Sequence, residues 1–277
     1  MAHKILLLIL LLFSQQAFAL NVMAINVEWF WDENTPHEGR IVGIGDDKIP
    51  PPTKKEVDLE AFAIAQLILK HNVDIVGLVE VENHAVVKRI KQYLPRQWKV
   101  VFDKGRDSMT GQDVTILTRL TVNEQSITDS SPKQSYGSAT NIRPSKLLAV
   151  ALTDNNQQQY YVVVTHLISK RRATNDEKRT AQARSIAKLL DNKKSTYTHM
   201  IVMGDLNDEL GSTTLNTLLS TDLVAISNDH NYSYVYNNRK QLIDHILVTR
   251  NLSNNSAFID FNLGPISDHR GVMAKMR

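Results

Sequence analysis

The sequence predicts one α/β domain in which two β-sheets are covered by outer helices. Strands and helices alternate along the chain, and the predicted strands are short apolar runs, as is typical of buried strands. There are too many of them for a single covered sheet, which favours two sheets. No repeat or low-complexity linker divides the chain, and 277 residues with 42% hydrophobic and 22% charged residues suit one large globular domain.

The first half of the chain alternates strand and helix. Residues 21–31 read as a strand. A proline-rich approach then leads into apolar residues at helical spacing, which predict a helix over about 56–71. A buried strand is expected over 73–81 and a short helix over 85–94, where Pro95 ends it.

The second half is richer in strands. "WKVVF" and "DVTILTR" predict strands on either side of a polar loop, and "SKLLAVALT" and "QQYYVVVTHL" predict a hairpin with a polar turn. A helix is expected from about 176 to 190, with Thr174 or Asn175 as its cap. The remaining expected elements are a strand in "MIVMGD", a short helix near 213–220, and strands in 242–249 and "ISDHRGVMAKM".

The N-terminus has the charged, apolar and small-residue order of a secretory signal. Lys4 precedes an apolar run that is too short to span a membrane, and Ala19 ends a small-x-small site. We expect a signal peptide over 1–19 and a mature domain over 20–277, secreted or periplasmic and not stably membrane-bound. An uncleaved anchor is the alternative. Removing this segment lowers the net charge from +3 to +2, too small to predict a polyanionic partner.

Six apolar segments each deliver polar side chains at or beside a strand. A carboxylate next to a buried strand is costly unless it is paired or coordinates a cation. Each case alone is also explained by a capping acid or a hydrogen-bonded core histidine. Together they favour a shared cleft beyond the strand ends. The side chains concerned are Asn26, Glu80, His166, Asp205, Asn207, Asp244, Asp268 and His269.

The chemistry of this set is coherent. Asn26, Glu80 and Asp268 offer hard oxygen ligands, and the chain has no cysteine, so Mg²⁺ or Mn²⁺ is favoured over a structural zinc ion. Histidines close to acids suit proton transfer and stabilisation of a charged transition state. Arg143 precedes a strand, and its planar guanidinium can bind phosphate.

Six motifs in this order carry a family resemblance: "GLVEVEN", "RPSKLLAV", "VVVTHL", "MGDLND", "LIDHILV" and "ISDHRGV". From about Asn21 to the C-terminus the chain resembles the endonuclease/exonuclease/phosphatase superfamily. The fold that this implies is deoxyribonuclease I-like, a two-sheet α/β sandwich with outer helices. "THLISKRR" and "GDLND" after a signal peptide look most like the secreted bacterial nuclease branch.

The resemblance implies a metal-binding role for part of the set. Glu80 matches the family's principal metal-binding glutamate, Asn26 matches the asparagine near the metal, and Asp268 lies beside the metal. Arg143 resembles a phosphate-contacting arginine. The implied cofactor is Mg²⁺, with Mn²⁺ as an alternative.

The resemblance also implies catalytic roles. Asp205 and Asn207 match the pair that orients the attacking water. His269 matches the terminal histidine at the scissile phosphate, and Asp244 matches the acid that holds it. His166 matches the histidine of the central strand.

Two further features leave alternatives open. In deoxyribonucleases the central histidine has its own acid, and Asp103 is the candidate for His166, although the alignment needs a gap. Trp29, Phe30 and Trp31 can stack bases, but three rings beside a first strand are more often part of the core.

A basic run, "SKRRATNDEKR", follows the predicted central strand. Such runs are often a solvated face. Because its first basic residues come four positions after His166, we expect them at the rim of the cleft. There Arg171 and Arg172 can contact flanking phosphates of a nucleic acid.

The expected function is that of an exported, metal-dependent phosphodiesterase that hydrolyses DNA or RNA, acting as a monomer. A phosphatase or sphingomyelinase-type phosphodiesterase of the same superfamily would carry much the same catalytic set. A secreted binding or toxin-like module without catalysis is the alternative of another class. The intact polar set argues against it, because burying these groups without a function is unfavourable.

Overall fold

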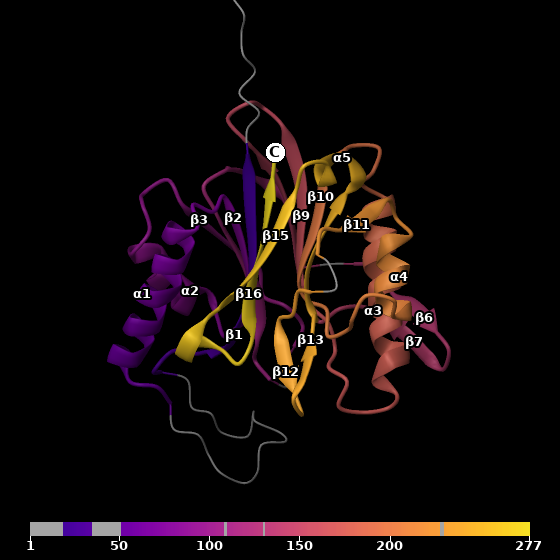
Figure 1. Ribbon diagram of the computed structural model, residues 1–277, viewed down its shortest axis with the longest axis horizontal. Coiled ribbons are helices and arrows are strands. Elements are labelled where there is room, and N and C mark those ends of the chain that lie inside the picture. The colour runs from indigo at the N-terminus through magenta and orange to yellow at the C-terminus, as the bar shows by residue number, and fades with distance from the viewer. Residues whose placement is uncertain (1–18, 35–50, 108–109, 130, 228–229) are drawn as a thin grey trace, which may run out of the picture.

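The computed structural model contains two six-stranded sheets packed face to face, with helices on both outer faces (Figure 1). It describes residues 19–34, 51–107, 110–129, 131–227 and 230–277. The predicted two-sheet α/β sandwich is confirmed. The predicted signal peptide lies, except for Ala19, outside the described residues. Among the helices that are described, none has the length and apolar character needed to cross a membrane.

The first sheet contains the N- and C-terminal strands, in the order β15-β16-β1-β2-β4-β3. Two helices cover its outer face. Thr53 caps the first of them in a capping box with Glu56, and the Asn83 side chain caps the second. The bounds are β1 Leu20–Phe30, α1 Lys54–Lys70, β2 Ile75–Val81, α2 His84–Gln92, β3 Lys99–Phe102, β4 Asp113–Thr118, β15 Ala257–Asn262 and β16 Arg270–Met276.

The second sheet has the order β11-β14-β10-β9-β8-β5. The predicted hairpin is its β8–β9 pair, which is antiparallel with Lys146 opposite His166. Helices α3 and α4 cover its outer face (Figure 1). The bounds are β5 Thr121–Thr128, β8 Lys146–Thr153, β9 Gln159–His166, α3 Asn175–Asp191, β10 Met200–Asp205, α4 Thr213–Leu219, β11 Leu223–Ala225 and β14 Asp244–Thr249.

Alternating apolar side chains divide the interior into three layers. Val22 and Ala24 of β1 pack between the sheets, against residues such as Val162 of β9. Met23 and Ile25 point the other way, to the layer under α1 and α2. Because successive side chains point to opposite faces of the sheet and both faces are buried, each central strand is a continuous apolar run in the sequence. A third layer lies between the second sheet and α3 and α4.

Several small elements escaped the sequence prediction. They are the edge strands β5, β11 and β15, the hairpin β6 (Gln134–Tyr136) and β7 (Ala139–Ile142), the hairpin β12 (Tyr234–Tyr236) and β13 (Arg239–Gln241), helix α5 (Arg250–Ser253) and a 3-10 turn at Gly264–Ile266. Most are short, and all are partly exposed, so their apolar periodicity is weak.

The topology brings together one edge of each sheet, namely the edge formed by the ends of its central strands. Strands β1 and β2 are parallel, as are β9 and β10, so their carboxyl ends lie at this edge. Strands β14 and β16 run antiparallel to their neighbours, so their amino-terminal ends lie there too. Asp205 therefore ends β10 while Asp244 opposes it at the start of β14.

Candidate active site

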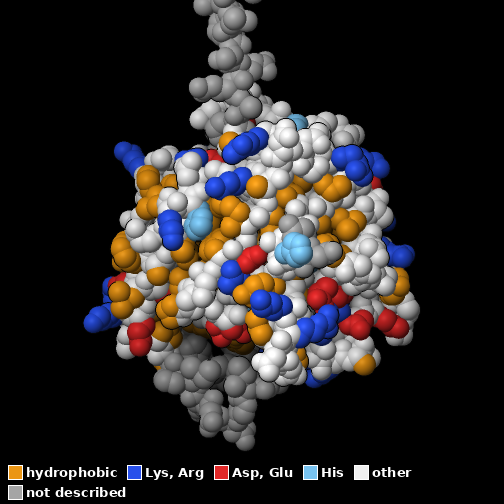
Figure 2. Space-filling view, in the orientation of Figure 1, with side chains coloured by type: hydrophobic (Ala, Val, Ile, Leu, Met, Phe, Trp, Pro, Cys, Tyr) orange, Lys and Arg blue, Asp and Glu red, His pale blue; other side chains and the backbone are white. Residues whose placement is uncertain are grey.

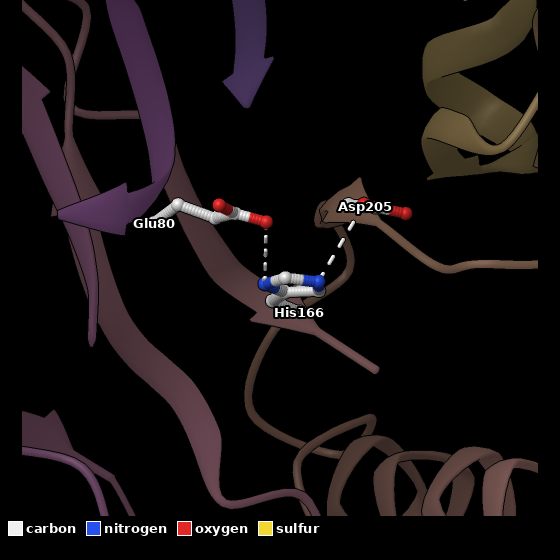
Figure 3. A group of neighbouring side chains, drawn as sticks. All are labelled: Glu80, His166 and Asp205. Carbon is white, nitrogen blue, oxygen red and sulfur yellow. Dashed lines mark ion pairs between the residues drawn. The ribbon is translucent and has the colours of Figure 1, made fainter. Parts of the chain in front are cut away.

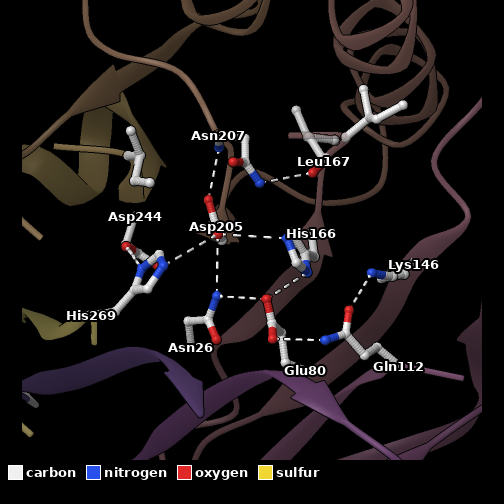
Figure 4. A network of polar contacts seen from close by, with 12 residues as sticks. Asn26, Glu80, Gln112, Lys146, His166, Leu167, Asp205, Asn207, Asp244 and His269 are labelled. Carbon is white, nitrogen blue, oxygen red and sulfur yellow. Dashed lines mark hydrogen bonds and ion pairs between the residues drawn. The ribbon is translucent and has the colours of Figure 1, made fainter. Parts of the chain in front are cut away.

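Asp205 lies at the centre of the polar network at this edge (Figure 4). Its side chain is buried, its Oδ1 accepts a hydrogen bond from the Asn207 backbone N–H at 2.8 Å, and its Oδ2 accepts one from Asn26 Nδ2 at 3.2 Å. Burial, with the negative charge of Asp244 nearby, raises the pKa of Asp205 to about 7. A carboxyl group that changes charge near neutral pH suits a general base.

The turn that carries Asp205 requires unusual residues. Gly204 has φ +127°, and a Cβ atom there would lie 2.1 Å from the carbonyl oxygen of Thr165. Asn207 has φ 52°, in the left-handed region that asparagine tolerates better than most residues. Its Nδ2 donates to the carbonyl of Leu167 at 3.0 Å. Asn207 thus holds Asp205 and joins this turn to the end of β9.

Asp244 and His269 form the shortest pair at the site. His269 Nδ1 donates to Asp244 Oδ2 at 2.6 Å, and both side chains are buried. Burial by itself lowers the pKa of His269, but the charge and hydrogen bond of Asp244 outweigh it and raise that pKa to about 10. His269 Nε2 lies 4.0 Å from Asp205 Oδ2. A charged imidazolium therefore faces Asp205, with its other nitrogen fixed by Asp244.

Glu80 and His166 complete the cluster on its other side (Figure 3). His166 Nε2 lies 3.5 Å from Asp205 Oδ2, and Nδ1 lies 3.9 Å from Glu80 Oε1. Burial lowers the pKa of His166 well below its ordinary value, and Lys146 adds to this effect, so the ring is neutral at pH 7. Burial raises the pKa of Glu80.

Local backbone irregularities aim Glu80 and Asn26 into the cluster. The pairing of β2 with β4 shifts register around Glu80, which has φ 67°, and β1 shifts register just after Asn26. Bulges commonly redirect side chains beside active sites. Asn26 Nδ2 donates to Glu80 Oε1 at 3.1 Å, while its own oxygen accepts from the Glu28 backbone N–H at 2.9 Å. Asn26 thus positions two carboxylates, and its role as an oxygen ligand of a metal stays a prediction.

Two buried residues at the site were not identified from the sequence. Gln112 Nε2 donates to Glu80 Oε2 at 2.7 Å, and Lys146 Nζ donates to Gln112 Oε1 at 2.8 Å. Lys146 Nζ also lies 3.1 Å from Asp107 Oδ2. The lysine of "RPSKLLAV", at the start of a buried strand, was the one available signal. This chain of contacts fixes the carboxylate of Glu80.

The cluster has the chemistry of a divalent-cation site. Ligand atoms of Glu80, His166 and Asp205 lie within 4.8 Å of one another, and so do those of Asp205, Asp244 and His269. Within the described residues, the buried His166 Nδ1 has no hydrogen-bond partner. Closely spaced buried carboxylates are costly without a cation or protons. The residues present therefore fit a hard divalent ion, with the first group better placed, because Asp244 and His269 already bind each other.

The other predicted site residues lie at the periphery. The Asp268 side chain is half exposed, with Oδ1 3.9 Å from His269 Nε2, and its backbone N–H donates to Glu28 Oε2 at 2.8 Å. Arg143 is half-buried. Burial lowers the pKa of Arg106, and the positive charge of Arg143 lowers it further. Neither residue belongs to the central cluster.

The basic run divides into structural and exposed parts. Arg179 is fully buried and contacts Asp208, and Lys170 Nζ lies 3.0 Å from the same carboxylate. Arg171 and Arg172 are exposed, between the end of β9 and the start of α3. Asp208 therefore anchors this loop to the turn that carries Asp205.

Asp103 is not the acidic partner of His166, so that prediction is wrong. It is exposed, and the acids within 4 Å of the His166 ring nitrogens are Glu80 and Asp205. Phe30 and Trp31 are buried, as the alternative core interpretation expected, and Trp31 stacks on the partly buried Trp29 with ring centroids 5.4 Å apart.

The chain matches the model of a known protein family and shares its fold with several solved structures. The family model described as "Endonuclease/Exonuclease/phosphatase family" matches residues 23–269. SmcL shares the fold with a TM-score of 0.64 and 16% identity, over 94% of this chain and 99% of that chain. A beta toxin mutant from Staphylococcus aureus with bound magnesium ions has a TM-score of 0.62 and 15% identity, over 94% of this chain and 100% of that chain. Truncated TDP2 from Caenorhabditis elegans has a TM-score of 0.61 and 14% identity, over 94% of this chain and 97% of that chain.

No curated protein sequence gives a significant match. At such low identities the solved structures establish the fold, and the resemblance to a secreted bacterial nuclease branch stays a prediction. The family model, in contrast, covers most of the chain and spans every residue of the central cluster. The chain therefore belongs to the endonuclease/exonuclease/phosphatase family.

Proposed function

We propose that the chain is a Mg²⁺-dependent nuclease that hydrolyses phosphodiester bonds by direct attack of water. Membership of the family makes it a metal-dependent phosphodiester hydrolase; nucleic acid as substrate, and Mg²⁺ as the metal, are the proposed parts. One observation carries the proposal. A carboxylate with a pKa near 7, Asp205, lies between a neutral histidine, His166, and a charged one, His269.

Proton transfer in this arrangement starts at Asp205. Its carboxylate accepts a proton from water as the water oxygen attacks phosphorus, while the bond from phosphorus to the leaving oxygen breaks. The Asn207 N–H keeps Oδ1 of Asp205 in place. The imidazolium of His269 donates a hydrogen bond to the charged phosphoryl group, and Asp244 keeps it protonated. Each such preorganised donor commonly contributes about 3 kcal/mol to catalysis.

Glu80, with His166 and Asp205 beside it, would hold the cation. When bound there, a divalent ion neutralises a phosphoryl oxygen and stabilises charge on the leaving oxygen. The chain from Gln112 to Lys146 fixes Glu80 for this purpose. The preference for Mg²⁺ over zinc rests on oxygen donors and on the absence of cysteine.

Basic residues near the cluster support a nucleic acid as substrate. Arg171 and Arg172 are exposed on the loop that begins next to His166, and Arg143 lies just before β8. Arginines outside the reacting centre can contact the phosphates that flank the scissile bond of a strand. A small phosphomonoester offers no such flanking charges.

The test is a substrate panel with the mature protein. Plasmid, linear DNA, RNA, inositol phosphates and sphingomyelin are incubated with Mg²⁺, with and without EDTA. We expect EDTA-sensitive cleavage of DNA or RNA. Asp205→Asn should lower kcat at least about a hundredfold while circular dichroism stays unchanged. Asp103→Asn, which alters an exposed acid outside the site, is the matched control and should retain full activity.

Turnover of lipid or inositol phosphate alone would instead favour a phosphatase or sphingomyelinase-type enzyme. Near-normal turnover by Asp205→Asn would remove the proposed base. Export through the segment 1–19 and a monomeric state stay predictions, which N-terminal sequencing of the secreted protein and light scattering can check.

A further inference from the structure

The hairpin β12–β13 lies at the edge of the candidate active site and has no role in the mechanism above (Figure 1). The ring of Tyr234 packs against the ring of His269, with centroids 4.7 Å apart and planes at 32°. Two residues further along β12, the side chain of Tyr236 is exposed, with 58% of its surface accessible. An aromatic row therefore leads from the catalytic histidine toward solvent.

The root of the hairpin is tied to the catalytic pair. The hydroxyl oxygen of Ser233 accepts the backbone N–H of Asp244 at 2.9 Å, and the carbonyl of Ser233 accepts the N–H of Arg270 at 2.6 Å. Asp244 is one member of the pair, and Arg270 directly follows the other. The guanidinium of Arg270 and the ammonium of Lys240 both lie over the ring of Tyr232, at 4.6 and 4.5 Å. The hairpin is thus held in a fixed relation to the site.

The strand register separates the two faces of the hairpin. Side chains alternate along a strand, so Tyr234 and Tyr236 share the face that touches His269. Arg239 pairs with Tyr236 and so lies on this face too, where its Nη2 donates to Glu209 Oε2 at 2.7 Å. The site-side face therefore carries two phenol rings and a guanidinium.

We propose that this site-side face stacks the unpaired bases of a single-stranded nucleic acid beside the phosphate that is hydrolysed; the proposal rests on the nuclease function above. Every base has a flat π-face, so aromatic stacking binds a strand without regard to sequence. The faces of paired bases are covered in a duplex, so the hairpin selects single strands or unpaired ends. On the visible face of this region Lys and Arg side chains are interspersed with Asp and Glu side chains (Figure 2), and the basic ones can contact phosphates.

A lipid surface is the competing partner, and the hairpin is poorly built for it. Val235 and Tyr236 are both exposed but point to opposite faces, so they form no continuous apolar patch. The tip is Asn237 and Asn238, both with positive φ, as in the turns that favour asparagine. A polar tip would have to enter the bilayer first, which is unfavourable.

The experiment measures binding by fluorescence anisotropy with the full chain. The probes are a labelled single strand of about eight nucleotides and an abasic strand of the same length and charge. Cleavage is prevented by EDTA in one series, and in a second series by the Asp205→Asn background in Mg²⁺.

Tyr236→Ala should weaken binding of the base-bearing strand about tenfold and leave binding of the abasic strand unaffected. Tyr236→Phe should keep wild-type affinity. Tyr93→Ala, which alters a partly exposed tyrosine at the end of α2, is the control and should bind like wild type.

Each other result overturns the inference. An equal loss for base-bearing and abasic strands would show that Tyr236 does not stack bases. In a parallel assay with phosphatidylserine vesicles, a loss of vesicle binding by Tyr236→Ala, with oligonucleotide binding intact, would identify lipid as the partner. If wild type cleaves and binds DNA but Tyr236→Ala binds equally well, this inference fails while the nuclease proposal stands. If wild type binds no oligonucleotide in either series, this inference fails, while the nuclease proposal is decided by the cleavage panel.

Discussion

The Asp244→Asn variant gives the sharpest test of how the site keeps His269 charged. In the wild type, the buried Asp244 carboxylate accepts a 2.6 Å hydrogen bond from His269 Nδ1. It is the main cause that raises the pKa of His269 from 6.5 to about 10 against the opposing effect of burial. Such a difference corresponds to about 5 kcal/mol in favour of the imidazolium. Asparagine keeps the shape and removes the charge.

The sign of the effect follows from the direction of that shift. Without Asp244, the main contribution that raises the pKa of His269 is lost, and burial, which lowers it, is opposed only by the weaker contributions of Asp205 and Asp268, so the pKa falls. At pH 8 a larger fraction of the rings is then neutral, and in that fraction one charged donor to the phosphoryl group is lost. Loss of one preorganised donor lowers kcat by about 100- to 1000-fold. At pH 6 a larger fraction of the variant's rings is protonated, so the deficit relative to wild type should be smaller.

The assay is the initial rate of DNA cleavage in saturating Mg²⁺ at pH 6 and pH 8, each compared with wild type at the same pH. Asp222→Asn, which removes a largely exposed carboxylate beside the same sheet, serves as the control and should be fully active. A deficit that does not change with pH, or near-normal activity at pH 8, would show that the charge of His269 is not what Asp244 maintains.

Three further predictions concern the metal, the substrate and the fold. Mg²⁺ at about one hundred times its Kd should stabilise the protein by about 2.7 kcal/mol, raising Tm by about 5–10 °C in a manner reversed by EDTA, and Glu80→Gln should abolish most of the rise. Neutralising Arg171 and Arg172 should flatten the dependence of KM on ionic strength, and an unchanged slope would mean a merely solvated loop. Gly204→Ala should lower Tm strongly or prevent folding, because a methyl group there would overlap a neighbouring carbonyl oxygen; a Tm close to wild type would contradict this.

Much of the fold and the site was accessible to sequence reasoning because both are encoded locally. The central strands are uninterrupted apolar runs, so the polar residues that end them are conspicuous. Asp205 and His166 each directly follow such a run, and both lie in the cluster. Asp244 was found in the same way at the start of its strand. The alternation of strands and helices predicted the layers, which the structure confirms.

What sequence reasoning missed depends on contacts between distant segments. Gln112 lies 32 residues from Glu80, and Lys146 lies 34 residues from Gln112, and no local pattern reports such contacts. The β12–β13 hairpin has three-residue strands, too short for a visible alternation. Asp103 was assigned from the resemblance to deoxyribonucleases, across a gap in the alignment, and in the folded chain it is exposed to solvent.

The same burial that tunes the site makes the metal-free protein sensitive to pH. The folded-state pKa of Asp205 is about 7, above its ordinary 3.8, so its neutral form contributes stability that is complete below about pH 4 and lost as pH rises through 7. As Asp205 becomes charged above pH 7, it repels the neighbouring carboxylates of Glu80 and Asp244, and among the described residues the positive charges of His269 and Lys146 lie close enough to offset part of this repulsion. A bound cation offsets this repulsion, and because protons compete with it, its stabilising effect should be larger at pH 8 than at pH 6. The buried acids thus disfavour the metal-free fold under the conditions in which they catalyse, which couples the stability of the domain to its cofactor.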